Sequence, residues 1–260
     1  MSDAPAPTAF GLMIIGDELL SGKRQDRHLG EVIRMLDERG LELAWARMEG
    51  DDPARITSAL RETMAGNDVV FSCGGIGGTP DDRTRQCAAE AAGQRLAIHP
   101  EGRRELEAQF GPDGTPQRLR MVEFPERAAL IPNPVNRVPG FSLGQHHFVP
   151  GFPNMAWPMI AWVLDHHYGH LHAVGQRLES AIVVQGARES QLTPLLEDFT
   201  ARYPELRVSC LPRWAPPDFE LELGLRGSAE RVPGAMAELQ AAVTELGFSW
   251  QERLPAAVSG

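Results

Sequence analysis

The fold of this chain is decided by residues 73–85, which read CGGIGGTPDDRTR. The apolar run Asp68–Cys73 predicts a buried strand, and four of the five residues after it are glycine. Thr79, Pro80 and Asp82 then suit the N-cap, the first position and the capping-box carboxylate of a helix. A strand, a glycine-rich turn and a helix in this order are typical of a parallel α/β sheet.

Outward from this stretch, the first half of the chain alternates between strand-like and helix-like segments. Strands are expected at 10–15, 41–48 and 68–73, with shorter ones at 128–131 and 146–149. Helices are expected at 26–39, from about 51, from about 81 to 92, at 101–110 and at 153–167. This alternation predicts an α/β domain over residues 10–170, after a disordered N-terminus at 1–9.

A second domain is expected beyond a boundary at residues 168–175. Its predicted strands are 177–185, 206–211 and 219–225, and its predicted helices are 189–202 and 229–246. In the third strand, Phe219, Leu221, Leu223 and Leu225 alternate so that they share one face. The order βαββα, completed by a final strand at 248–251, matches a small ferredoxin-like α+β domain over residues 176–252.

Composition and charge exclude several classes of protein. The formal charge of −10 leaves no global positive field, so we expect no nucleic-acid partner. No apolar run approaches the ~20 residues of a transmembrane helix, so we expect no membrane partner. The cysteines Cys73, Cys87 and Cys210 form no CxxC pair, and no signal peptide is apparent. These features predict a cytoplasmic protein with reduced thiols.

The glycine-rich loop, residues 74–78, is a candidate phosphate site. Glycines let the backbone approach a ligand closely, and free N–H groups at a helix start favour anions. The loop is not a GxGxxG motif, because Pro80 stands at the third glycine position, and it lacks the GK[ST] ending of a P-loop. The alternative is a tight strand-to-helix turn in which Asp82 is only a cap.

Acidic residues near this loop indicate a divalent cation. Two carboxylates as close as those of Asp81 and Asp82 repel each other by about 4 kcal/mol at an intermediate dielectric. Mg²⁺ typically takes one or two carboxylates together with phosphate oxygens, which turns this repulsion into coordination. Asp17 and Glu18 follow the first strand and are expected at the carboxyl-end edge of the sheet. Asp26 could face the same crevice, and its alternative is an N-cap.

Four parts of the sequence together resemble the molybdopterin-binding (MoCF) domain family: GDELLSG at 16–22, Asp26, GGIGGTPDDRT at 74–84 and FVPGFPNM at 148–155. The resemblance covers about residues 10–168 and is closest to the N-terminal domain of competence/damage-inducible protein A. That family places a similar small domain next. The resemblance implies a three-layer α/β/α fold with a mostly parallel sheet, and we expect a homo-oligomer.

The resemblance also implies roles for particular residues. Asp82 and Asp26 match acidic metal- and nucleotide-site positions of the family, so the implied cofactor is a divalent metal, Mg²⁺, Mn²⁺ or Co²⁺. Asp81 or Asp17 would be the base. The positions implied in phosphate or nucleotide binding are Gly74, Gly75, Gly77, Gly78, Thr79, Thr84 and Gly151.

Two functions from different classes follow. Relatives of competence/damage-inducible protein A are similar to metal-dependent ADP-ribose pyrophosphatases, which implies a hydrolase that acts on ADP-ribose or a similar dinucleotide. Gephyrin-type members bind or adenylylate molybdopterin, so the alternative is a non-catalytic module for a nucleotide or a molybdopterin-like small molecule. A scaffold that binds no phosphate is a third reading. Full-length relatives append a deamidase domain, for which this chain leaves no room, so deamidation is not expected.

The sequence departs from the family pattern at several positions. Gly78 stands where the family usually has proline, and His28 stands where asparagine is common. Asn136 and Arg137 stand where a glycine and a neighbouring residue are usual. Each change could alter the choice of ligand or abolish turnover.

Overall fold

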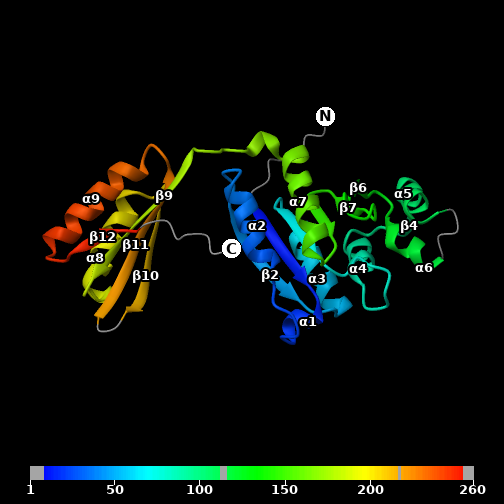
Figure 1. Ribbon diagram of the computed structural model, residues 1–260, viewed down its shortest axis with the longest axis horizontal. Coiled ribbons are helices and arrows are strands. Elements are labelled where there is room, and N and C mark those ends of the chain that lie inside the picture. Colours follow the sequence, from blue (N-terminus) through cyan, green and yellow to red (C-terminus); the bar gives the residue numbers. More distant parts are fainter. Residues whose placement is uncertain (1–8, 112–115, 216–217, 254–260) are drawn as a thin grey trace. The chain divides into compact units, whose positions relative to one another are not determined.

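The computed structural model describes residues 9–111, 116–215 and 218–253, and it divides into two compact units between His172 and Ala173 (Figure 1). The predicted disordered N-terminus lies outside the described residues except for its last position. None of the helices in the described ranges is long and apolar enough to cross a membrane.

A six-stranded sheet forms the centre of the first unit, in the order β2-β1-β3-β8-β7-β6. Its strands are β1 (Phe10–Ile15), β2 (Leu43–Glu49), β3 (Val69–Cys73), β6 (Ala129–Ile131), β7 (Gly140–Leu143) and β8 (His146–Val149). Strands β2, β1, β3 and β8 run parallel, whereas β7 and β6 pair in the antiparallel sense. The predicted α/β class with a mostly parallel sheet is confirmed.

Helices cover both faces of this sheet, which is why β1 is buried along its whole length. Leu12 and Ile14 pack with residues of two helices, whereas Met13 and Ile15 point to the opposite face and pack with residues of two others. The first pair of helices is α2 (His28–Asp37) and α7 (Pro153–His167), and the second is α3 (Pro53–Met64) and α4 (Thr84–Ala91). Alternating side chains of one strand thus hold three layers together.

Several short elements complete the first unit. They are α1 (Asp17–Leu20), β4 (Leu96–Ile98), α5 (Pro100–Phe110), α6 (Pro116–Leu119), η1 (Arg120–Val122), β5 (Glu123–Pro125) and η2 (Gly169–Leu171). Strands β4 and β5 pair with each other. Apart from α5, the sequence analysis missed all of these elements, together with β7, because none exceeds four residues and hydrophobic periodicity needs a longer window.

The helix after the glycine-rich loop begins later than predicted. The Asp82 carboxylate accepts a hydrogen bond from the Thr79 amide at 2.8 Å, as in a capping box, but the chain then forms only a turn. The Thr84 amide donates to the carbonyl of Gly75 rather than to that of Pro80, so a helical ladder cannot run through this turn. Helix α4 therefore starts at Thr84, and the prediction of a helix from Thr79 and Pro80 was wrong.

The second unit is a four-stranded antiparallel sheet in the order β10-β11-β9-β12, with two helices on one face (Figure 1). Its elements are β9 (Arg177–Gln185), α8 (Glu189–Arg202), β10 (Arg207–Ala215), β11 (Asp218–Ser228), α9 (Val232–Glu245) and β12 (Trp250–Glu252). This order is the predicted ferredoxin-like arrangement. Leu221, Leu223 and Leu225 are buried, whereas Phe219, near the start of β11, is 50% exposed.

Candidate functional site

Two cavities lie at the edge of the sheet where its parallel strands end. The first, of about 440 Å³, is lined by residues that follow β1, β2, β3 and β8. The second, of about 590 Å³, lies beside the start of α2. The two cavities share the lining residues Ile15, Glu18, Arg24, Gly151 and Phe152. The parallel topology brings these separate loops to one place, as is usual for open α/β sheets.

The carbonyl groups of the glycine-rich loop are held from behind by the first two residues of α4. The hydroxyl of Thr84 donates to the Gly74 carbonyl and its amide donates to the Gly75 carbonyl, both at 3.0 Å. The guanidinium of Arg85 donates to the Gly77 carbonyl at 2.7 Å. Three carbonyls of the loop are therefore directed toward α4.

This anchoring sets the direction of the loop amides. In a trans peptide, a carbonyl and the N–H that follows it point to opposite sides, so the amides of Gly75, Ile76 and Gly78 point away from α4. Within the described part of the chain, the amides of residues 75–78 donate to no other protein atom. All four residues line the first cavity. A row of free amides of this kind is a neutral anion-binding surface.

Glycine is required at two positions of the loop. Gly74 and Gly75 have φ values of +111° and +68°, which side-chain-bearing residues rarely adopt. A Cβ on Gly74 would overlap the carbonyl oxygen of Ile15, and a Cβ on Gly75 would overlap the hydroxyl of Thr84. Gly75 thus allows the close approach between the loop and α4 that orients the amides, and Gly74 allows the close approach of the loop to the end of β1.

Arg85 supports the glycine-rich loop, a role that the sequence analysis missed. Its side chain is 1% exposed, and besides the loop carbonyl it donates to the carbonyls of Arg120 and Glu123. Burial lowers the pKa of its guanidinium, and the nearby charges of Glu123 and Asp82 act in the opposite direction. An arginine in the first turns of a predicted helix resembles any surface residue, so its burial could not be predicted from the sequence.

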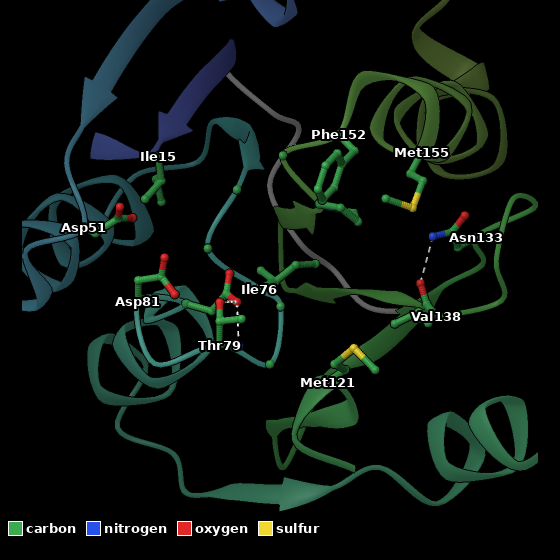
Figure 2. Close-up of a pocket in the computed structure, with 18 of the residues that line it drawn as sticks. Ile15, Asp51, Ile76, Thr79, Asp81, Met121, Asn133, Val138, Phe152 and Met155 are labelled. Carbon is green, nitrogen blue, oxygen red and sulfur yellow. Dashed lines mark hydrogen bonds between the residues drawn. The ribbon is translucent and has the colours of Figure 1, made fainter. Parts of the chain in front are cut away.

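Carboxylates occupy one side of the first cavity. Figure 2 shows Asp51 and Asp81 on this side, and Asp82 and Glu18 also line the cavity. Burial raises the pKa of Asp51, and the charges of Asp17, Glu18 and Asp81 raise it further against a hydrogen bond from the Asp17 amide. The sequence analysis treated Asp51 only as part of a helix start, so it missed this residue.

Thr79 connects the other two aspartates of the cavity. Its amide and its hydroxyl both donate to the Asp82 carboxylate. Hydrogen bonding to the Thr79 side chain and to its own backbone amide lowers the pKa of Asp81, although the single proton of the Thr79 hydroxyl serves one carboxylate at a time. The cavity therefore combines Asp81, which favours the ionised form, with Asp51, which favours the protonated form more than usual. Carboxyl groups with pKa values shifted apart are suited to different roles in one reaction.

Asp26 and Asp82 line different cavities. Asp26 belongs to the second cavity, where its carboxylate oxygens accept from the amides of His28 and Leu29, both at 2.9 Å. It thus caps α2, the alternative that the sequence left open. The neighbouring His28 is buried and contacts the Gly151 carbonyl through Nε2 at 3.1 Å.

Two other predicted site residues support the walls rather than line them. Thr84 is fully buried behind the loop, where both of its donors are used. Asp17 lines neither cavity, and its carboxylate accepts from the Asp51 amide at 3.1 Å while the Asp51 carboxylate accepts from the Asp17 amide at 3.0 Å. The remaining predicted residues, Gly74, Gly75, Gly77, Gly78, Thr79, Asp81, Asp82 and Gly151, all line the first cavity.

Comparison with known proteins agrees with this architecture. Residues 11–169 match the family model described as "Probable molybdopterin binding domain". The chain belongs to this family. Within the molybdopterin-binding domain family, a CinA-like protein of Geobacter metallireducens is 31% identical over 245 residues, which are 89% of this chain and 58% of that protein. The chain thus spans little more than half the length of that relative.

Two further similarities extend the comparison. A protein of Pyrobaculum calidifontis is 26% identical over 248 residues, which cover 92% of this chain and 94% of that protein. The crystal structure of "the protein CinA with unknown function" from Thermoplasma acidophilum has 28% identity and a TM-score of 0.56, and it covers 60% of this chain and 96% of that one. The resemblance of the sequence to a molybdopterin-binding, CinA-like domain is confirmed.

Proposed function

We propose that this protein binds a small phosphate-bearing molecule in the first cavity and, with a divalent cation, hydrolyses the pyrophosphate of ADP-ribose or a similar dinucleotide. The observation that carries the proposal is the pairing of free amides at residues 75–78 with the carboxylates of Asp51, Asp81 and Asp82 in one cavity. Amides attract the phosphate, and carboxylates attract the cation that a pyrophosphate brings with it.

The chain's own residues account for binding and orientation. The loop amides donate to phosphate oxygens, and Arg24, which lines both cavities, adds a positive charge. Within the described residues Arg24 takes part in no ion pair, so its guanidinium is available to a ligand. Asp82 holds the loop conformation through Thr79.

The donor set fits a divalent cation that shares its coordination with a phosphate. Over residues 9–111, 116–215 and 218–253, no three His, Cys, Asp or Glu side chains are arranged to hold a metal ion by themselves. Mg²⁺ needs only one or two carboxylates when phosphate oxygens and water complete its shell, and Asp81 with Asp51 would supply them. Mn²⁺ and Co²⁺ could take the same position. A bound cation stabilises charge on the phosphate and lowers the pKa of water.

Asp51 and Asp81 would meet the cation in different protonation states. Burial and its acidic neighbours hold Asp51 closer to its protonated form, so binding of the cation would have to release a proton from it. Asp81 stays ionised because its pKa is lowered. Asp26 lines only the second cavity, so a metal ion bound by Asp26 would have to be reached from that cavity.

A non-catalytic module that binds a nucleotide or a molybdopterin-like molecule is the second candidate. The free amides of residues 75–78 support it, because they can bind a phosphate without any cation. The two candidates share the loop amides as the phosphate site and differ in whether the bound ligand is cleaved.

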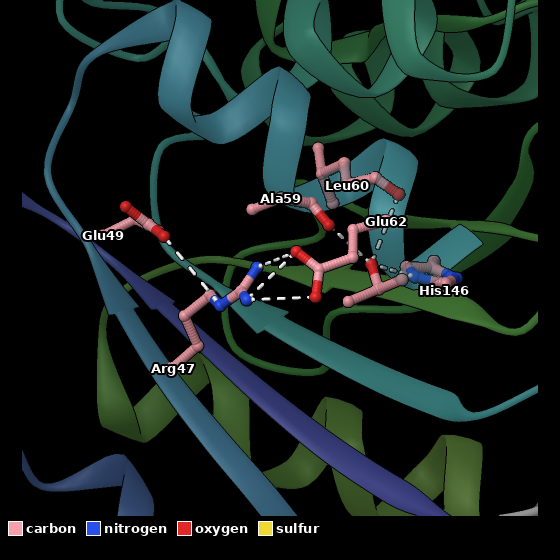
Figure 3. Close-up of polar contacts among 7 residues, drawn as sticks. Arg47, Glu49, Ala59, Leu60, Glu62 and His146 are labelled. Atoms are coloured by element: carbon pink, nitrogen blue, oxygen red, sulfur yellow. Dashed lines mark hydrogen bonds and ion pairs between the residues drawn. The ribbon is translucent and has the colours of Figure 1, made fainter. Parts of the chain in front are cut away.

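The deciding experiment incubates the full chain with ADP-ribose and Mg²⁺, Mn²⁺ or Co²⁺ and measures AMP and ribose 5-phosphate by chromatography. The variants are Asp81→Asn and Asp51→Asn, and the matched control is Glu62→Gln, a surface carboxylate paired with Arg47 (Figure 3). Cleavage by the wild type and the control, at least 100-fold slower in the Asp81 variant, supports the hydrolase. Saturable binding without cleavage supports the module, and no binding overturns both.

A further inference from the structure

The side of the first cavity opposite the carboxylates has a different chemistry. Figure 2 shows Phe152, Met155 and Val138 on this side, and Met121 closes it from below in that view. Phe152 is 56% exposed although it precedes the buried helix α7. An aromatic ring that stays exposed at the wall of a cavity offers a flat apolar surface, and methionine sulfur makes favourable contacts with ring edges.

An amide donor stands beside this apolar surface. The Oδ1 atom of Asn136 accepts two hydrogen bonds, one from Asn133 Nδ2 at 2.8 Å and one from the Val138 amide at 3.0 Å. These two bonds fix which end of the Asn136 amide is the oxygen, so its Nδ2 must point the other way. No protein atom in the described ranges accepts a hydrogen bond from that Nδ2.

Asn133 keeps this donor in place. It is 5% exposed, and its Nδ2 also donates to the Val138 carbonyl at 2.9 Å while its Oδ1 accepts from the Val135 amide at 3.0 Å. Both protons of the Asn133 amide are therefore used inside the protein. Of the two asparagines, only Asn136 has donors left for a ligand.

We propose that Asn136 and Phe152 select the ring of the ligand: a planar nitrogen heterocycle stacks on Phe152, and one of its acceptor atoms accepts a hydrogen bond from Asn136 Nδ2. The proposal rests on the proposed function in placing the phosphate of the same ligand at the loop amides. Purines and pterins share the required chemistry, because both are flat and both carry ring nitrogens that accept hydrogen bonds.

Other occupants fit this wall less well. An alkyl chain would cover the apolar side chains but would leave the Asn136 donor desolvated and unpaired. An anionic group has little to bind here, because Arg24 is the only basic residue among those that line the cavity in the described structure. A flat ring with acceptor atoms satisfies both the aromatic surface and the donor.

The two asparagines have different roles at this wall. Asn136 presents the free donor, whereas Asn133 is buried and uses both amide protons within the protein. We therefore assign Asn136 as a residue that determines specificity for the ring, and Asn133 as the residue that positions it.

The test measures binding by calorimetry without any cation, so that hydrolysis plays no part. The probes are adenosine and 6-hydroxymethylpterin, which carry a ring without phosphate, and ribose 5-phosphate, which carries phosphate without a ring. The variants are Asn136→Asp, which keeps both accepted hydrogen bonds but loses the donors, and Phe152→Leu. The matched controls are Asn154→Asp, an exposed neighbour, and Phe110→Leu, an exposed phenylalanine outside the cavity.

We expect at least one ring probe to bind, and to bind tenfold or more weakly to both cavity variants, with neither control affected. Ribose 5-phosphate should bind all variants equally, and the ring probe that binds identifies purine or pterin. Failure of both ring probes to bind, or an equal loss for ribose 5-phosphate, overturns the ring site. Neither result bears on cleavage of ADP-ribose, which is measured separately, so the two proposals can fail independently.

Discussion

The guanidinium of Arg85 lies behind the glycine-rich loop and donates a hydrogen bond of 2.7 Å to the carbonyl oxygen of Gly77. Together with the two hydrogen bonds from Thr84, this contact fixes the side of the loop on which the amides are exposed. The anion-binding surface therefore depends on a residue that no ligand would touch.

Replacement of Arg85 by methionine is expected to damage both stability and binding. The carbonyls of Gly77, Arg120 and Glu123 would lose a donor, and unsatisfied buried groups cost about 1–3 kcal/mol each. We expect urea unfolding to show a loss of about 2–4 kcal/mol and calorimetry to show at least tenfold weaker binding of ribose 5-phosphate. Arg83→Met, at the exposed neighbouring position, is the control. Equal behaviour of the two variants would contradict the supporting role.

Substitution of alanine for Gly75 should abolish phosphate binding. The φ value of +68° costs any L-residue about 1–2 kcal/mol, and the new Cβ would push against Thr84 and displace α4 from the loop. Gly93→Ala is a matched control, because Gly93 has a φ value of +62° and open space around its Cβ position. Both variants should lose similar backbone stability, but only the Gly75 variant should lose ribose 5-phosphate binding. Retained binding in the Gly75 variant would contradict the close-approach argument.

Two buried histidines predict a loss of stability in acid. Burial lowers the pKa of His146 to about 4 and that of His147 to about 3. The Thr63 hydroxyl donates to the Ala59 carbonyl, so it accepts from Nε2 of neutral His146 at 2.9 Å (Figure 3). Since the unfolded state takes up protons below pH ~6.5, stability falls as the pH drops from that value toward the lowered pKa values.

The measurement is urea unfolding between pH 7.5 and pH 4.5. Each pKa unit corresponds to about 1.4 kcal/mol, so His146 alone should contribute about 3 kcal/mol over its window. His146→Gln keeps a side chain that can donate to Thr63 and should flatten this part of the pH dependence. His170→Gln, at an exposed position, should leave the pH dependence unchanged. A slope that is the same in all three proteins would show that His146 does not contribute to the acid loss.

Asp26 can be tested as a cap and as a metal ligand with one pair of variants. The two carboxylate oxygens of Asp26 accept separately from the amides of His28 and Leu29, so Asp26→Asn keeps one of these hydrogen bonds whereas Asp26→Ala removes both. If the residue only caps α2, the alanine variant should lose about 0.5–2 kcal/mol and the asparagine variant less. Loss of Mn²⁺ binding in the asparagine variant, followed by electron paramagnetic resonance, would instead support the metal role implied by the family resemblance.

The pH dependence of stability that Asp51 causes should be opposite to that of the two buried histidines. Its raised pKa means that ionisation of this carboxyl opposes folding, so stability from this group is lost as pH rises through the raised value. Asp51→Asn keeps an oxygen that can accept from the Asp17 amide and should be at least as stable as the wild type at pH 7. The same variant should lose the increase in melting temperature that Mn²⁺ and ADP-ribose together give the wild type. An unchanged increase would remove Asp51 from the proposed cation site.

Long elements could be predicted from the sequence because their periodicity is visible. Helix α7 at Pro153–His167 and helix α8 at Glu189–Arg202 begin and end where the apolar pattern indicated. The start of α4 could not be predicted, because a tertiary hydrogen bond from the Thr84 amide to the loop competes with the local cap at Thr79. A local sequence signal therefore fails to predict a helix start where a carbonyl elsewhere in the fold accepts the hydrogen bond of an amide that the helix would use.

The candidate site could be predicted only in part for a related reason. The glycines indicated a loop close to a ligand, because glycine adopts positive φ values without steric cost. The sequence could not show that Arg85 is buried, that Asp51 faces Asp81, or that Asn133 orients Asn136, since each relation joins residues through the folded chain rather than through spacing. The roles of the predicted site residues remain predictions for the experiments above.

The free amides of residues 75–78 also determine how phosphate binding responds to ionic strength. A chain with a formal charge of −10 repels a phosphate compound at long range, so electrostatic steering cannot speed the encounter. Neutral peptide dipoles act only at contact, where mobile ions do little to screen them. Apart from the contribution of Arg24, affinity should therefore change little between dilute and concentrated KCl, unlike that of a site built from lysines. Such a site keeps its occupancy when the salt content of the cell varies.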